Sequence, residues 1–213
     1  MGVYVNPGNQ AFSRIAGKNY VDKTNLINVM NDRVGGDESL VCVSRPRRFG
    51  KSYAAKMLTA YYDCSCDSHK LFADKVIAES ESYEEHLNRY NVICLDISGF
   101  VSEVKKHDGS LKSIPVRIEQ ALRKDLLESG FKPESGDTLN DFLIRIVSQP
   151  EGKPFIFIID EWDAIIREAK DDNEAQIAYL NLLRGWFKNT NFTPKVVAAA
   201  YMTGILPIKK DGS

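Results

Sequence analysis

The sequence predicts a three-layer α/β/α fold, in which a mainly parallel β-sheet lies between two layers of helices. Short apolar runs rich in β-branched residues recur along the chain, at residues 40–43, 92–97, 155–160 and 196–203. The runs are almost continuously apolar, which is typical of strands covered on both faces. Stretches of helical periodicity separate them, so successive strands can be joined by right-handed crossovers.

Length and composition narrow the class of protein. A chain of 213 residues can form one domain with a sizeable core, and its 43% hydrophobic and 27% charged residues are ordinary for a globular protein. The net charge of −1 argues against a dedicated nucleic-acid-binding protein, which would be basic. No apolar run has the length of a membrane span, and the N-terminus lacks the pattern of a secretory signal. We therefore expect a cytoplasmic protein with no membrane partner.

The first predicted strand, at residues 40–43, leads directly into the segment SRPRRFGKSY at residues 44–53. Residues 50–52 of this segment match the end of the Walker A phosphate-binding loop, G-x-x-x-x-G-K-[ST]. Arg45 occupies the position of the first glycine of that pattern, and proline follows it. Because a residue before proline favours extended conformations, we expect Arg45 to be the last residue of the strand.

A helix is predicted directly after this loop. Apolar residues recur at helical spacing, at Ala54, Met57, Leu58 and Tyr61. A strand–loop–helix setting is what a Walker A match requires, and the amides of residues 47–52 at the helix N-terminus would bind an anion. Four cations crowd the loop, namely Arg45, Arg47, Arg48 and Lys51. A bound polyphosphate would relieve their repulsion; the alternative is a basic surface patch paired with carboxylates.

The four cysteines indicate reduced thiols more than a metal site. Cys42 and Cys94 fall within predicted strands, whereas Cys64 and Cys66 lie in a loop segment close to His69. A C-x-C pair with one histidine lacks the paired spacing of common zinc sites. We therefore favour a loop with reduced thiols and keep zinc as the alternative.

Three further helices are predicted in the second half of the chain. Their apolar positions are Leu111, Ile114, Ile118, Leu122 and Leu126, then Leu139, Phe142, Leu143, Ile146 and Val147, and finally Ile177, Leu180, Leu183 and Phe187. Gly130 is expected to stop the first of them, and residues 31–39 and 130–137 are expected to be loops. We interpret these stripes as core packing.

Acidic and polar residues end the later strands. The stretch FIFIIDEWD has the form of a Walker B strand, in which Asp160 would hold Mg²⁺ opposite the Ser52 hydroxyl and Glu161 would polarise the attacking water. Thr203 ends the fourth strand and could sense the γ-phosphate or water; Asp96 is a weaker candidate at the end of the second. The alternatives are acids that cap the next helix and an ordinary strand-end threonine. Because ligands bind beyond the carboxyl ends of parallel strands, both motifs point to one site.

With these motifs the chain resembles the bacterial AAA-ATPase-like family of P-loop proteins. The matching segments, in the family's order, are YVDKT (20–24), RPRRFGKS (45–52), LDIS (95–98), IIDEWD (158–163) and YMTGI (201–205). The resemblance implies that the arginine at position 45 is a family trait. It also implies a Mg-ATP-binding P-loop core in which Lys51 contacts phosphate and the YVDKT segment approaches the nucleotide.

The resemblance also bears on the extent of the chain. Family members continue beyond the TGI strand, and many carry a nuclease-like domain. We therefore expect residues 1–213 to be a single P-loop domain, without lid or nuclease domain, that is the N-terminal part of a longer protein or a shortened member. No arginine finger is identifiable in the sequence, so self-association or a protein partner is an open alternative.

These inferences give one set of candidate residues and three hypotheses. The catalytic candidates are Glu161, Lys51 and Thr203, and the metal ligands are Ser52 and Asp160. The nucleotide-binding candidates are Arg47, Arg48, Phe49, Gly50, Lys51, Ser52 and Tyr53. The leading hypothesis is an ATPase that uses Mg²⁺. The second is a nucleotide-dependent switch without hydrolysis, and the third is a nucleic-acid contact through the arginines of the loop, which the net charge does not favour.

Overall fold

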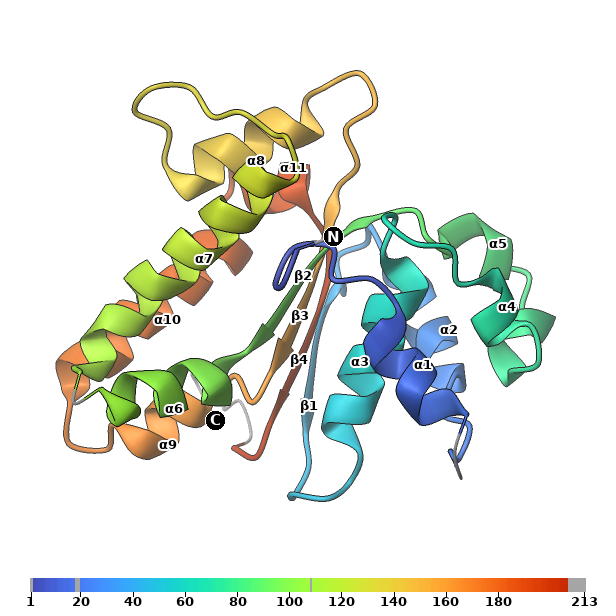
Figure 1. Cartoon of the computed structure of the whole chain (residues 1–213), viewed down its shortest axis with the longest axis horizontal. Coiled ribbons are helices and arrows are strands. Elements are labelled where there is room, and N and C mark those ends of the chain that lie inside the picture. The colour runs from blue at the N-terminus through green and yellow to red at the C-terminus, as the bar shows by residue number, and fades with distance from the viewer. Residues whose placement is uncertain (1, 18–19, 108, 207–213) are drawn as a thin grey trace.

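The computed structural model describes residues 2–17, 20–107 and 109–206. Its centre is a parallel sheet with the strand order β1-β4-β3-β2. The strands are β1 (Leu40–Ser44), β2 (Asn91–Asp96), β3 (Phe155–Asp160) and β4 (Val197–Gly204). Figure 1 shows helices on both faces of the sheet, which confirms the predicted three-layer α/β/α fold.

The chain fills the two helical layers one after the other (Figure 1). One face is covered by α1 (Gln10–Ala16), α2 (Asn25–Asn31), α3 (Lys51–Tyr62), α4 (His69–Phe72) and α5 (Tyr83–His86), with a 3₁₀ turn at Val76–Glu79. The other is covered by α6 (Ile97–Lys106), α7 (Ile114–Glu128), α8 (Leu139–Val147), α9 (Ala164–Glu168), α10 (Asn173–Phe187) and α11 (Thr193–Val196), with a 3₁₀ turn at Leu111–Ser113.

Strand β3 separates two hydrophobic cores. All six of its residues are buried. Phe157 and Ile159 belong to the core under α6–α11, whereas Ile156 and Ile158 belong to the core under α1–α5. This alternation explains why the sequence of β3 shows a continuous apolar run rather than a period of two.

The predicted strand ends agree with the observed ones to within one residue. In α10, however, one predicted core position is wrong: Ile177 is 55% exposed, whereas Leu183 is buried and Phe187 packs against the core. The buried face is made by Tyr179, Leu182, Leu183 and Trp186, which also follow i, i+3, i+4, i+7 spacing. The two large aromatic side chains bury more apolar surface than Ile177 would, so they determine which face turns inward.

Helix α6 was not predicted, although the sequence contains a signal for it. The Asp96 carboxylate accepts hydrogen bonds from the amides of Ser98 and Gly99, which is the role of an N-cap residue. Phe100, Val101 and Val104 then bury one side of the helix. Its start therefore lies at the carboxyl end of β2, on the edge where the other strand-end residues gather.

Candidate functional site

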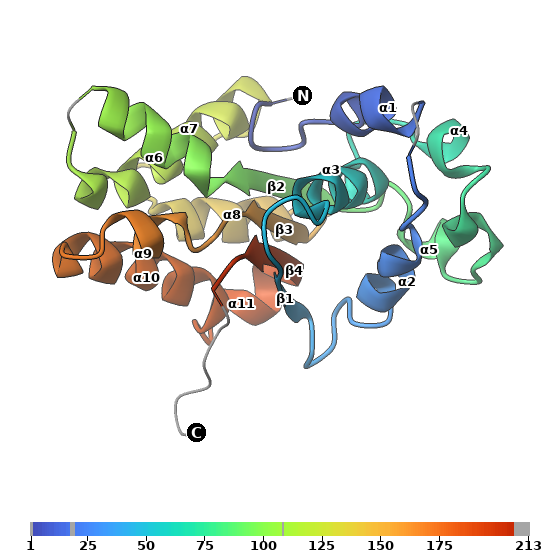
Figure 2. The same cartoon turned by 90° about the horizontal axis from the view of Figure 1, so that it is seen from below.

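A cleft of about 720 Å³ opens at the carboxyl edge of the sheet. Figure 2, which views the fold from below, shows the loop after β1 on one side and α6 and α9 on the other. Strand register brings the strand-end residues to this edge, since Val43 pairs with Thr203 and Ile159 pairs with Met202. Residues 47–48, 50–53, 96 and 160–161 line the cleft, so the two predicted motifs face one space.

The loop between β1 and α3 lines this cleft and contains backbone amides that have no backbone partner in the described part of the chain. Strand β1 ends at Ser44, one residue before the predicted end, but the Arg45 amide still donates to the Gly204 carbonyl at 3.1 Å. Beyond it, no backbone carbonyl among the described residues accepts a hydrogen bond from the amides of residues 47–52. Gly50, at φ 78°, caps α3 in the left-handed region that favours glycine. Such unpaired amides at a helix N-terminus form an anion site.

Lys51 is the most buried cation of the loop, with 7% of its surface exposed. Its ammonium group donates to the carbonyls of Arg45 at 2.8 Å and Pro46 at 3.0 Å. An ammonium group has three donors, so one remains for a ligand in the cleft. The lysine thus also ties the beginning of the loop to its end.

The two strand-end acids are joined by Thr203. Its hydroxyl donates to the Asp160 carboxylate and accepts from the Glu161 amide at 3.3 Å. Asp160 is only 9% exposed and Thr203 is fully buried. Thr203 therefore lies behind the acids and does not line the cleft, which makes it a residue that positions them.

Arg167 is a cation of the cleft that the motifs did not reveal. It lies on α9, its guanidinium forms an ion pair with the Glu161 carboxylate, and its Nε lies 3.4 Å from Asp163. Asp163 is fully buried and also accepts from the amides of Ile205 and Leu206, at 2.9 and 2.7 Å. Only its i+4 spacing from Asp163 could have indicated Arg167 in the sequence.

Helix α6 supplies the wall opposite the loop. Ser98, Ser102 and Lys105 line the cleft from this helix. Lys105 donates to Glu168 at 2.5 Å, and this hydrogen bond holds the pKa of the Glu168 carboxyl below its usual value. The wall is thus polar, but its one lysine is already paired.

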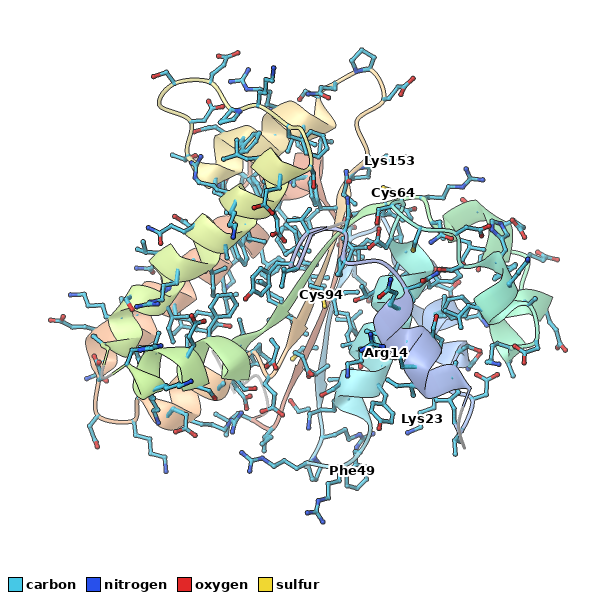
Figure 3. All side chains as sticks on the ribbon, viewed as in Figure 1. Arg14, Lys23, Phe49, Cys64, Cys94 and Lys153 are labelled. Carbon is cyan, nitrogen blue, oxygen red and sulfur yellow. The ribbon has the colours of Figure 1, made fainter. Side chains whose placement is uncertain are left out.

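A second cleft of about 790 Å³ lies on the other side of the loop. Its lining includes Tyr20, Lys23 and Phe49, and Arg48, Gly50 and Tyr53 line both clefts. A Cβ atom at Gly50 would lie 3.3 Å from the Lys23 ammonium nitrogen, which places the YVDKT segment against the loop. In Figure 3, Lys23 and Phe49 lie at this end of the molecule. Phe49, which is 61% exposed, faces the second cleft instead of the first.

None of the four cysteines lines either cleft. Figure 3 shows Cys64 at the opposite end of the sheet from Phe49 and Cys94 near its middle. Burial raises the pKa of Cys64 and Cys66, and raises that of Cys94 to about 11. Within the described ranges, no three side chains of His, Cys, Asp or Glu gather as a metal site. A Mg²⁺ ion shared with phosphates needs only one or two protein oxygens, and the Ser52 hydroxyl and the Asp160 carboxylate are of that type.

The chain is similar to a known protein family. A family model described as "Predicted AAA-ATPase" matches residues 7–213. That description supports nucleotide binding in general. Comparisons with curated proteins and with solved structures gave no match. In the part of the chain that the structure describes, no helix has the length and apolar character needed to cross a bilayer.

Proposed function

The chain belongs to the AAA-ATPase-like family, and we propose that it binds ATP with Mg²⁺ and hydrolyses the terminal phosphoanhydride bond. One observation carries the proposal: the loop cations and the strand-end acids, which are far apart in the sequence, line the same cleft. Phosphoryl transfer requires an anion cradle, a metal ligand and a group that orients the nucleophile. The cleft offers a residue for each of these requirements.

The loop is the phosphate-binding element in this proposal. The amides of residues 47–52 have no backbone partner within the described ranges, and Lys51 keeps one free donor, so both would bind phosphate oxygens of the nucleotide. Arg47 and Arg48 line the cleft and add positive charge. An extended Arg45 before proline leaves these amides available, so the missing first glycine does not prevent phosphate binding.

The strand ends supply the chemistry. Ser52 and Asp160 hold Mg²⁺, which when bound neutralises charge that develops on the phosphate oxygens. Glu161 orients the attacking water and accepts its proton. Thr203 holds both acids through its hydroxyl, so it acts as a positioning residue and does not itself contact the nucleotide.

The second cleft suits the base and ribose. Because Arg48, Gly50 and Tyr53 line both clefts, a ligand with its phosphates in the first can extend into the second. Tyr20, Phe49 and Tyr53 there offer aromatic surface for stacking on a flat base. Stacking accepts either purine, so ATP and GTP must be compared by titration.

A nucleotide-dependent switch is the second candidate function. The ion pair between Arg167 and Glu161 favours it, because a carboxylate neutralised by a guanidinium is a poor partner for an attacking water. In such a protein ATP binds and changes a surface for a protein partner or a second copy, without turnover.

Titration with Mg-ATP followed by phosphate release tests the proposal on the wild type, Lys51→Ala and Glu161→Gln. We expect Lys51→Ala to lose binding, and Glu161→Gln to retain binding while release falls by about 100-fold or more. Lys124→Ala, which changes an exposed lysine on α7, is the matched control and should behave as wild type. Binding that survives Lys51→Ala contradicts the proposal, and lysine-dependent binding without any release favours the switch.

A further inference from the structure

We propose that Arg167 senses the γ-phosphate: it holds the Glu161 carboxylate in the nucleotide-free protein and transfers to the terminal phosphate when a triphosphate binds. The proposal rests on the proposed function, because it assumes that the loop holds a nucleotide. It adds an internal arginine that the sequence motifs do not identify. It also gives the ion pair between Arg167 and Glu161 a role in the reaction.

The position of Arg167 fits this role. It lies on the short helix that directly follows Glu161, and its side chain lines the cleft that contains Lys51 and Ser52. The side chain is 16% exposed, so it is largely desolvated but has access to the cleft. A guanidinium group in such a setting interacts strongly with phosphate oxygens.

The guanidinium group of Arg167 contacts two acids that have different roles. One terminal nitrogen pairs with Glu161, whereas Nε lies 3.4 Å from Asp163. Asp163 is fixed, because it is fully buried and holds the amides of Ile205 and Leu206. The contact with Asp163 can therefore anchor the stem of the side chain while the outer nitrogens change partner.

The backbone of Glu161 is also held in place. Its φ of 53° lies in the left-handed region, which non-glycine residues seldom adopt without support from their surroundings. The Glu161 amide donates to the Thr203 hydroxyl at 3.3 Å, and the Trp162 amide donates to the Thr203 carbonyl at 2.9 Å. Because the backbone is fixed, the carboxylate can be released by movement of Arg167 alone.

A third phosphate is the group that would move Arg167. A γ-phosphate carries more charge than one carboxylate and offers oxygens that match both arms of a guanidinium. A diphosphate lacks this group, so Arg167 would stay with Glu161. The glutamate would then be free to orient water only when there is a bond to hydrolyse.

Lys105 provides the matched control. It is a cation of the same cleft and is paired with Glu168, as Arg167 is paired with Glu161. If Arg167 contributed only positive charge to the cleft, removal of either side chain would weaken nucleotide binding alike. The proposal requires that only Arg167 distinguishes triphosphate from diphosphate.

The test is a double-mutant cycle on dissociation constants, measured by calorimetry with Mg-ADP and with Mg²⁺ and a non-hydrolysable ATP analogue. The variants are Arg167→Ala, Glu161→Gln, their combination and Lys105→Ala. We expect Arg167→Ala to reduce the preference for triphosphate by about tenfold, and Lys105→Ala to leave it unchanged. Glu161→Gln should strengthen triphosphate binding several-fold, but only where Arg167 is present.

Three results would overturn the proposal. They are an equal loss for both nucleotides in Arg167→Ala, a Glu161→Gln effect that persists without Arg167, and the same loss of preference in Lys105→Ala. Thermal melting checks that each variant folds. If Arg167→Ala does not fold, Arg167→Lys keeps the charge but should still lose the preference for triphosphate. If the wild type binds neither nucleotide, both the proposed function and the inference fail. If the wild type binds both nucleotides and Arg167→Ala keeps the preference for triphosphate, only the inference fails.

Discussion

At the scale of single residues, one hydroxyl group organises the acids of the candidate site. The Thr203 hydroxyl donates to Asp160 and accepts from the Glu161 amide, and the threonine itself is fully buried. Removing it would leave a nearly buried carboxylate and a backbone amide without their partner. Unsatisfied buried groups cost about 1–3 kcal/mol, so stability and activity should both depend on this hydroxyl.

We therefore predict that Thr203→Val lowers the free energy of unfolding by about 1–3 kcal/mol and weakens Mg²⁺-dependent phosphate release by about 10–100-fold. Valine keeps the shape of threonine and removes only the hydrogen bonds. Denaturant unfolding and phosphate release measure the two effects. Thr203→Ser retains the hydroxyl and should stay close to wild type; a valine variant with full activity would contradict the positioning role.

Sequence reasoning found the residues that belong to contiguous motifs and missed those that depend on tertiary packing. Lys51 and Asp160 were predicted because loop and strand patterns have a fixed local spacing, and the cleft brings them together. Arg167 was missed because its significance depends on a contact with Glu161 that the spacing of charges does not specify. Thr203 was found at its strand end, but its burial behind the acids depends on strand register.

At the scale of elements, the N-terminal segment covers the free edge of β2. Val5 forms an antiparallel bridge with Ile93, and the Cys94 amide donates to the Tyr4 carbonyl at 2.8 Å. The Asp125 carboxylate on α7 holds this segment, since it accepts from the amides of Tyr4 at 2.5 Å and Val5 at 3.0 Å. An exposed strand edge invites pairing with other chains, so this cover protects the sheet.

Asp125→Ala should release that cover. We expect the free energy of unfolding to fall by about 1–3 kcal/mol, because two amides lose a charged acceptor. Hydrogen exchange at the β2 amides should become faster, while exchange at β3 stays slow. As a matched control, Glu128→Ala removes an exposed acid from the same helix and should leave exchange in β2 unchanged. If the β2 amides exchanged as slowly in Asp125→Ala as in the wild type, the N-terminal segment would stay in place without this carboxylate.

An element could be predicted from the sequence where only one structure fitted its pattern of apolar residues. The strand at Phe155–Asp160 was predicted at both ends because its apolar run is bounded by Pro154 and by the acids. In α10 the prediction was wrong only at Ile177, because two overlapping stripes fit the same helix and tertiary packing selects Tyr179 and Trp186 over it. Periodicity detects a helix more reliably than it determines its orientation.

At the scale of the whole molecule, the cleft joins the two helical layers. The loop leads into α3, which packs in the layer of α1–α5, whereas α6 and α9 belong to the layer on the other face (Figure 2). Each layer has its own hydrophobic core on its own side of the sheet. A ligand in the cleft would contact both layers, so its binding should stabilise the molecule as a whole and not the loop alone.

Thermal unfolding with and without Mg-ATP tests this directly. A ligand that binds only the folded state at 100 times its dissociation constant adds about 2.7 kcal/mol, which raises the melting temperature of a domain of this size by roughly 5–10 °C. We expect one transition that shifts as a unit, because contacts on both layers are gained together. Lys51→Ala should show no shift, and Lys124→Ala should shift as the wild type does. If the shift survived in Lys51→Ala, the stabilising nucleotide would be bound elsewhere. If only part of the transition moved, the two layers would unfold separately and the cleft would not couple them.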